Sequence, residues 1–335
     1  MFLNRCVARF PTWKNYKFLI ELKTATFAQS LSPVLIYHAI EPSHKKNPLI
    51  SGKSHSIPPE MLHQQLSLLK KYFNFISLQE FTQSLQKGQN IRGLAVVTFD
   101  DGYLSVIKWA VPILNDLNIP ATFFISTKLI QEQTFWRDKV RYIINQNLIR
   151  KFLSFARAEN QIFQVIKADP EGFYRDTKNP AIINSRVVEK MLDVFLVPYK
   201  KDISWMSQDI YCTPEILHKE CGKHITFGNH SHSHYVLSSM DKDEQYEEII
   251  RTEHILRDLN LPLSRIFSIP FGGERDFNRD TLDILQDIGY RGYALSVGYR
   301  VVNAHLPTQH IKEQHQLVAL QRFMPINHLG FLWMK

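Results

Sequence analysis

Two adjacent carboxylates stand at the end of an apolar run, in the segment TFDDG at residues 98–102. Like charges side by side disfavour each other, and a bound cation would relieve that repulsion. One carboxylate could then bind a metal ion while the other stays free to take up a proton. A strand followed by an Asp-Gly turn would give the same letters without any function, so this segment alone leaves both interpretations open.

Three histidines alternate in a second polar segment, GNHSHSH at residues 228–234. His230 and His234 are four residues apart, so both would reach one point if the segment turned helically, whereas His232 would point elsewhere. Imidazole together with carboxylate suits zinc and related divalent metals. With Asp101 the two histidines supply three ligands and leave positions open for water and substrate. Such an open site is typical of catalytic metals and not of structural ones.

A third polar segment is SIPFGG at residues 268–273. Pro270 fixes the chain direction and the glycines permit unusual backbone angles, so a backbone N–H there could stabilise an oxyanion. Pro-Phe-Gly-Gly is also an ordinary loop sequence. The joint occurrence decides, because chance loops would not be expected to supply a base, three metal ligands and a tight turn together.

Short apolar runs rich in β-branched and aromatic residues predict buried strands. They are residues 33–40, 94–99, 121–126, 225–228, 266–270 and 293–297. Helical patterns lie between them, at residues 59–72, 78–85, 104–117, 242–259 and 279–288. Alternating strands and helices predict parallel βα units that close into a barrel. The active site of such a barrel lies at the carboxyl ends of its strands, where all three polar segments fall.

Residues 128–212 interrupt this alternation, with helical patterns at 140–153 and 186–195 and no clear strand. We therefore expect one α/β domain over residues 1–335, a distorted (β/α) barrel of about seven parallel strands. Residues 1–32 would be an N-terminal extension and residues 128–212 a helical insertion. A chain of 335 residues needs no disulfide staples, and its three cysteines form no disulfide framework.

The formal net charge of +8 favours anionic partners such as acidic glycans or lipid headgroups. The basic residues are scattered in short pairs without a nucleic-acid motif, so no nucleic-acid partner is expected. No segment reaches the ~20 apolar residues of a membrane span, and the N-terminal apolar runs are too short for a signal peptide. These features predict a cytoplasmic protein. Residues 10–31 are either a capping helix or an interfacial helix that contacts a membrane surface.

In this order, the three segments resemble the motifs of the polysaccharide deacetylase family, also called carbohydrate esterase family four. Its T-F-D-D-G motif matches residues 98–102, its H-[ST]-x-x-H motif matches residues 230–234, and its P-[FY]-G motif matches residues 270–272. LIYH at residues 35–38 looks like the family's opening strand, and residues 112–124 look like the segment after its first motif. The resemblance covers roughly residues 33–130 and 213–300 and implies a distorted barrel of about seven strands.

The resemblance implies that Asp100 is the catalytic base. It makes Asp101, His230 and His234 the ligands of a divalent metal, usually zinc, with cobalt or nickel as alternatives. The metal would polarise an acetyl carbonyl and lower the pKa of a bound water. The expected substrate-binding residues are Tyr103, Pro270 and Phe271, with the Phe271 backbone N–H helping to hold the oxyanion.

Two features depart from the family pattern. The third motif usually begins with an arginine that tunes the base, and Ser268 stands in its place. The arginines that could compensate are Arg265, Arg275 and Arg322. The late L-x-H motif, which supplies a general-acid histidine, has no clean match. The histidines of that region are His305, His310, His315 and His328, of which His328 is a candidate.

The expected function is the hydrolysis of N-acetyl groups on a glycan, such as a surface polysaccharide, or on a lipid-linked sugar, with release of acetate. Tyr103 and the insertion would shape the sugar-binding groove. One alternative is an O-acetyl esterase or another metal amidohydrolase that uses the same site. Another is a barrel that binds carbohydrate with little or no turnover. The two departures favour that last alternative, and the intact carboxylate pair and histidine pair argue against it.

Overall fold

The computed structural model of the chain describes residues 31–43, 47–50, 56–131, 134–220, 224–296, 317–323 and 325. Within these ranges seven parallel strands follow one another around a ring. The ring strands are β1 (Val34–Tyr37), β5 (Leu94–Phe99), β6 (Ala121–Ile125), β7 (Ile225–Asn229), β8 (Ile266–Ser268), β9 (Gly292–Leu295) and β10 (Val318–Gln321). They form one path β1-β5-β6-β7 and a second path β8-β9-β10.

Backbone hydrogen bonds at two seams join these paths into a barrel. At one seam Phe227 of β7 donates its N–H to the carbonyl of Pro262 (2.9 Å) and accepts from the N–H of Ser264 (2.7 Å). At the other seam Ile36 of β1 donates to the carbonyl of Phe323, just after β10 (3.0 Å). The predicted barrel of about seven parallel strands is therefore confirmed.

An aromatic ladder crosses four neighbouring strands at one level of the barrel. Tyr37 pairs with Phe99, Phe99 with Phe123, and Phe123 with Phe227 in the strand register. Their ring centroids lie 5.5, 5.0 and 6.1 Å apart in that order. These strands are buried along almost their whole length, as expected of parallel strands that are covered on both faces. The register of this ladder sets the position along the barrel axis at which the polar segments after β5 and β7 begin.

Three short strands lie off this ring: β2 (Ala39–Ile40), β3 (Ser56–Ile57) and β4 (Asn74–Phe75). β2 pairs with β3, and β4 extends the sheet beside the start of β5. The helices that pack around the barrel are α2 (Pro59–Leu69), α3 (Leu78–Gln86), α4 (Val111–Leu117), α11 (Lys242–Asp258) and α12 (Arg279–Ile288). The helical pattern predicted over 104–117 is confirmed, and its middle part, Val106–Ala110, is π-helical and leads directly into α4.

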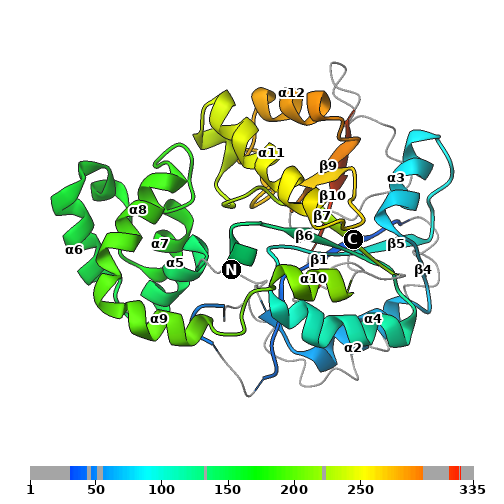
Figure 1. The fold of residues 1–335 in the computed structure, drawn as a ribbon, viewed down its shortest axis with the longest axis horizontal. Coiled ribbons are helices and arrows are strands. Elements are labelled where there is room, and N and C mark those ends of the chain that lie inside the picture. The colour runs from blue at the N-terminus through cyan, green and yellow to red at the C-terminus, as the bar shows by residue number, and fades with distance from the viewer. Residues whose placement is uncertain are drawn as a thin grey trace, which may run out of the picture.

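Between β6 and β7 the described residues form helices and no strand. Five of these helices make a lobe beside the barrel (Figure 1): α5 (Trp136–Asn145), α6 (Ile149–Glu159), α7 (Pro170–Asp176), α8 (Ser185–Phe195) and α9 (Lys200–Ser207). A sixth, α10 (Pro214–Glu220), leads to β7. The prediction of one helix over 140–153 is wrong, because Asn147 adopts a left-handed φ of 56° between α5 and α6. The lobe has its own aromatic core, in which Phe152 contacts Phe163, Phe173 and Phe195.

Several predictions concern residues outside the described ranges. These are residues 1–30 of the predicted extension, the end of the strand predicted over 293–297, and the four late histidines His305, His310, His315 and His328. Among the described residues no helix is both long and apolar enough to cross a bilayer. The cytoplasmic location, the membrane contact and the boundaries of the extension and insertion stay predictions.

Candidate metal centre and catalytic site

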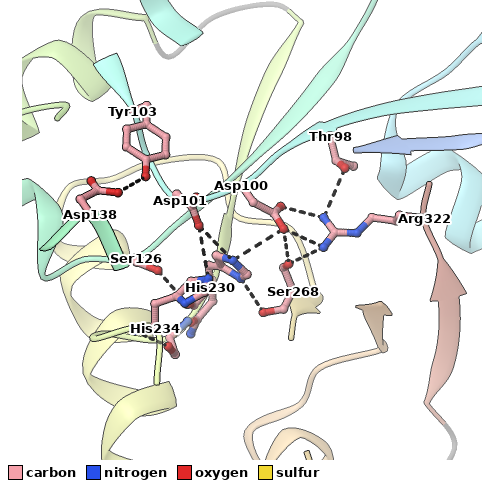
Figure 2. Close-up of polar contacts among 12 residues, drawn as sticks. Thr98, Asp100, Asp101, Tyr103, Ser126, Asp138, His230, His234, Ser268 and Arg322 are labelled. Carbon is pink, nitrogen blue, oxygen red and sulfur yellow. Dashed lines mark hydrogen bonds and ion pairs between the residues drawn. The ribbon is translucent and has the colours of Figure 1, made fainter. Parts of the chain in front are cut away.

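Asp101, His230 and His234 come together at the carboxyl end of the barrel (Figure 2). The Nε2 atom of His230 lies 3.5 Å from Oδ1 of Asp101, and the Nε2 atom of His234 lies 3.3 Å from that same oxygen. All three side chains are buried, and their ligand atoms lie within 4.8 Å of one another. Three ligands at this spacing fit one divalent ion with bonds of ~2.0–2.2 Å. The predicted ligand set is thus assembled from β5 and β7, which adjoin β6 on either side.

The two histidines reach one point, as predicted, but through a tight loop and not through a helical turn. Ser231 and His234 have φ values of 61° and 55°, and Asp101 has 79°. Non-glycine residues rarely adopt this left-handed region, and such strain tends to persist only where the surroundings hold it in place. Here the Ser231 hydroxyl accepts from the His234 N–H (3.0 Å), and the Asn229 side-chain carbonyl accepts from the Ser231 N–H (2.9 Å).

Hydrogen bonds fix the form in which His230 faces the site. Its Nδ1 lies 2.8 Å from the backbone carbonyl of Ser268. Because a carbonyl only accepts, Nδ1 carries a proton and Nε2 is the ring atom that faces Asp101, as metal binding requires. Burial would lower the pKa of His230, but Asp100 and Asp101 raise it above its ordinary value, whereas burial lowers the pKa of His234 to about 4. His232 points elsewhere, as predicted, with its Nδ1 at 2.9 Å from the Thr127 hydroxyl.

Asp100, the expected base, is bound by Arg322 (Figure 2). Arg322 follows β10, is 0% exposed and donates to both carboxylate oxygens at 2.7 Å. The Ser268 hydroxyl donates to Oδ2 of Asp100 (3.1 Å) and accepts from Arg322 (2.8 Å). Burial alone would raise the pKa of Asp100, but the charge and hydrogen bonds of Arg322 and the nearby His230 hold it below its ordinary value. Asp100 is therefore kept ionised.

Of the three candidates for the arginine that the third motif lacks, Arg322 is the one that contacts Asp100 and Ser268. The other two candidates lie elsewhere: Arg265 pairs with Glu253 at 2.9 Å, and Arg275 is exposed.

His38 is a site residue that the motif analysis did not single out. It follows Tyr37 at the end of β1, just as Asp100 follows Phe99 at the end of β5, and Tyr37 and Phe99 are register partners. His38 consequently lines the same cavity as Asp100 and the metal ligands. Burial lowers its pKa, while Asp101 and Asp100 act in the opposite direction. The signal in the sequence was a histidine at the end of an apolar strand. Only the pairing of β1 with β5 shows that this histidine lies at the site.

The site opens into a cavity of about 250 Å³, close to the lower end of ligand pockets, which begin near ~300 Å³. Its lining residues are His38, Asp100, Asp101, Phe135, Arg137, Arg141, Tyr174, Lys178, His230, His234, Phe271 and Ser296. Phe271, an expected substrate-binding residue, therefore lines the cavity. Pro270 is buried and is not part of the lining. Tyr103 is also absent from it, because its buried hydroxyl donates to Asp138 (2.9 Å) and its ring stacks on Tyr211.

The Pro-Phe-Gly turn presents Phe271 to the metal ligands. The ring of Phe271 meets that of His234 edge to face, with centroids 4.6 Å apart. Phe271 has a φ of 64° and Gly272 a φ of 71°. A Cβ on residue 272 would lie 2.3 Å from the backbone nitrogen of Ser296, so only glycine fits this close approach.

The family model of the polysaccharide deacetylases matches residues 87–293, which is more than half of the chain. The chain belongs to the polysaccharide deacetylase family. The matched range includes all three motifs and most of the barrel, and it ends before β10 and Arg322.

Two curated relatives of this family member are poly-β-1,6-N-acetyl-D-glucosamine N-deacetylases. The protein from Staphylococcus epidermidis is 29% identical over 126 residues, which are 34% of this chain and 43% of that protein. A protein from Staphylococcus aureus is 27% identical over 121 residues, which are 34% of this chain and 42% of the relative. The chain therefore matches less than half of the length of these relatives.

Solved deacetylase structures share the fold. Streptococcus pyogenes deacetylase PplD, in complex with acetate, has a TM-score of 0.55 at 15% identity, over 91% of this chain and 98% of that one. IcaB from Ammonifex degensii has a TM-score of 0.51 at 18% identity, over 88% and 91% of the two chains. At these identities the likeness concerns the fold alone.

In this family member the lobe between β6 and β7 supplies one wall of the cavity. Four of its residues reach the lining from α5, α7 and the turn after α7: Arg137, Arg141, Tyr174 and Lys178. The insertion was expected to shape the groove, but none of these four residues lies in a motif, so none of them was predicted. Only the packing of the lobe against the barrel brings them to the site.

Proposed function

We propose that the chain is a metal-dependent N-deacetylase that hydrolyses acetamido groups of a glycan to acetate and a free amine. One arrangement carries this proposal. The ligand triad Asp101, His230 and His234 lies at an open cavity, beside a carboxylate, Asp100, that Arg322 keeps ionised.

The donor set favours zinc, because two imidazoles and one carboxylate suit this ion, with cobalt or nickel as alternatives. A metal bound there would polarise the acetyl carbonyl and lower the pKa of a water. His230 donates its Nδ1 proton to Ser268, which leaves Nε2 as the atom that would bind a metal, and burial lowers the pKa of His234 to about 4, so this imidazole is neutral as metal binding needs.

The residues of the chain handle the protons. Asp100 accepts a proton from the water as its oxygen attacks the acetyl carbon, while Arg322 and Ser268 hold the carboxylate in place. The backbone N–H of Phe271 donates to the oxygen that becomes negative. His38, on the neighbouring strand, gives a proton to the amine nitrogen as the C–N bond breaks. The products are acetate and an amino sugar.

Two observations favour turnover over a barrel that merely binds sugar. Arg322 contacts Asp100 where the third motif lacks its arginine, and His38 lines the same cavity, where it could serve as the proton donor. For the substrate, the names of the curated relatives make poly-β-1,6-N-acetyl-D-glucosamine the first glycan to assay, with lipid-linked acetamido sugars next.

Acetate release from the purified protein tests the proposal. The protein is stripped of metal, reloaded with zinc, cobalt or nickel, and assayed on N-acetylated and O-acetylated oligosaccharides. We expect activity on the N-acetyl sugars that chelation abolishes and metal restores. His230→Asn should lose both metal and activity, whereas the matched control His232→Asn should keep the metal. Release from O-acetyl sugars alone would indicate an esterase, and sugar binding without release would indicate a binding protein.

A further inference from the structure

Arg137 is a buried cation that forms no ion pair with a carboxylate of the described residues. Its side chain lies on α5, is 1% exposed and stacks over the rings of Trp136 and Tyr174, 4.9 and 4.1 Å from their centroids. Its guanidinium donates to the Thr177 hydroxyl (3.0 Å) and the Tyr174 carbonyl (2.9 Å), which are both neutral acceptors. A charge taken out of water is costly unless it is paired. Within the described part of the chain, Arg137 forms no ion pair.

Lys178 brings a second cation to the same wall of the cavity. Its Nζ lies 4.8 Å from the centroid of the Phe271 ring and 5.8 Å from that of Tyr174. Burial lowers its pKa, and repulsion from Arg137 lowers it further. The structure records no ion pair of Lys178 with any described residue. Asp276 is the carboxylate that opposes this lowering of the Lys178 pKa. It accepts the Gly273 N–H at 2.7 Å instead of a hydrogen bond from Lys178.

The acid closest to Arg137 in sequence is already neutralised. Asp138 forms an ion pair with Arg141 and accepts hydroxyl hydrogens from Tyr103 and Tyr211. An excess of positive charge remains around Tyr174. Burial would raise the pKa of this phenol, yet Arg141, Arg137 and Lys178 lower it to about 7. Such a pocket attracts anions.

This positive wall lies one aromatic ring away from the metal ligands. The Phe271 ring contacts the His234 ring (4.6 Å between centroids), and it also lies 4.8 Å from Lys178 Nζ and 5.7 Å from Arg137 Cζ. All four residues line the one cavity. An anionic group held by the two cations would therefore belong to the acetylated sugar itself or to its direct neighbour.

We propose that Arg137 and Lys178 form an anion subsite, so that the substrate carries a carboxylate or phosphate beside its acetamido group. The substrate class is then an acidic amino-sugar glycan or a phosphate-linked amino sugar, and not a neutral one. This inference rests on the proposed deacetylase function. An Arg137 that served only to fill the lobe would leave Lys178 without a role, whereas an anionic substrate accounts for both cations. Charge-assisted hydrogen bonds supply the selectivity.

Matched sugars that differ in one charge test the subsite in the zinc-loaded, full-length protein. One pair is the methyl glycoside of N-acetylglucosaminuronic acid and its methyl ester. The other is N-acetylglucosamine 1-phosphate and methyl N-acetylglucosaminide. We expect kcat/KM to be at least about tenfold higher on the charged member of one pair, given the strength of charged hydrogen bonds. The pair that responds distinguishes a carboxylate from a phosphate.

Lys178→Met should lower kcat/KM on the charged sugar by about tenfold more than on its neutral partner, and so abolish the preference. Lys178→Arg should restore the preference. Lys190→Met, which removes an exposed lysine from α8 of the same lobe, is the matched control and should change neither rate. Arg137→Gln should act like Lys178→Met if it folds, and Lys178→Met alone carries the test if it does not. Equal rates on both members of each pair, or equal losses on both in Lys178→Met, would overturn the subsite.

A binding measurement separates failure of the subsite from failure of the proposed function. The same four sugars are titrated into the wild type and Lys178→Met by calorimetry. If no sugar releases acetate but a charged one binds and Lys178→Met weakens it, the deacetylase function falls and the subsite stands. If neutral sugars release acetate and bind as well as charged ones, the subsite falls alone. If no sugar releases acetate and no sugar shows charge-dependent binding, both the deacetylase function and the subsite fail.

Discussion

Arg322 and Asp100, which are 222 residues apart in sequence, form a buried bidentate ion pair at the carboxyl end of the barrel, with two bonds of 2.7 Å. Asp100 follows β5 and Arg322 follows β10. Both strands adjoin β1, one by strand pairing and the other through the seam at Phe323. The pair therefore joins Asp100, the proposed base, to the closure of the barrel, so the last strand contributes to the proposed catalytic site.

Removing Arg322 should shift the acidic limb of the pH–rate profile to higher pH. Arg322 opposes the effect of burial and lowers the pKa of Asp100, so without it burial raises that pKa. Asp100 must be ionised to act as the base. As the pH is lowered, the variant would therefore lose activity at a higher pH than the wild type does. The measurement is kcat/KM against pH for Arg322→Met and Arg322→Lys, with the smaller shift in the lysine variant.

Arg265→Met is the control, because this arginine pairs with Glu253 away from the site. Breaking a buried pair is expected to destabilise the fold by about 3–5 kcal/mol, so melting temperatures accompany the kinetics. An acidic limb that stays in place in folded Arg322→Met would contradict the role given to Arg322.

Asp100→Asn should lower kcat on N-acetyl sugars by about 10²–10⁴-fold, the range typical of a lost general base. The bound metal should remain, because the ligands are Asp101 and the two histidines. Elemental analysis and acetate release measure the two effects separately. Ser268→Ala removes a single hydrogen bond of 3.1 Å to the same carboxylate and should cost only severalfold. Unchanged activity in Asp100→Asn would remove Asp100 from the mechanism.

The sequence alone could predict most of the barrel, because strands covered on both faces appear as continuous apolar runs. Residues 94–99 and 279–288 coincide with β5 and α12, whose end is marked by Gly289. β10 was not predicted. Only one of its four residues is fully buried, so it lacks the pattern of the inner strands. Missing this strand left Arg322 as one of three equal candidates.

The site was predictable where local motifs hold it, as at Asp101, His230 and His234. It was not predictable where long-range register decides. His38 lines the same cavity as Asp100 because Tyr37 pairs with Phe99, 62 positions along the chain, and no local pattern encodes that pairing. Tyr103 was expected to help shape the sugar-binding groove. Its hydroxyl instead reaches Asp138 on α5, a contact created by the packing of the lobe.

His38→Gln should impair the hydrolysis of N-acetyl sugars far more than that of an activated ester. An amine leaves poorly without a proton, whereas p-nitrophenolate needs none, so p-nitrophenyl acetate bypasses a proton donor. We expect a loss of about 10²-fold or more on the amide and a rate near that of the wild type on the ester. Asp100→Asn should lose both activities. Equal losses on both substrates in His38→Gln would point to a positioning role.

Gly272→Ala should lower activity through the Pro-Phe-Gly turn, because its Cβ would lie 2.3 Å from the Ser296 nitrogen. The backbone of that turn must then move, and with it the Phe271 N–H and ring. Gly289→Ala is the matched control, since its φ is 90° but nothing lies within 4 Å of the added carbon. Both variants bear the left-handed backbone penalty of about 1–2 kcal/mol, which thermal unfolding measures. Gly272→Ala alone should also lose kcat while it keeps its metal. If the two variants lost stability alike and both kept full kcat, the turn would have no part in holding the oxyanion.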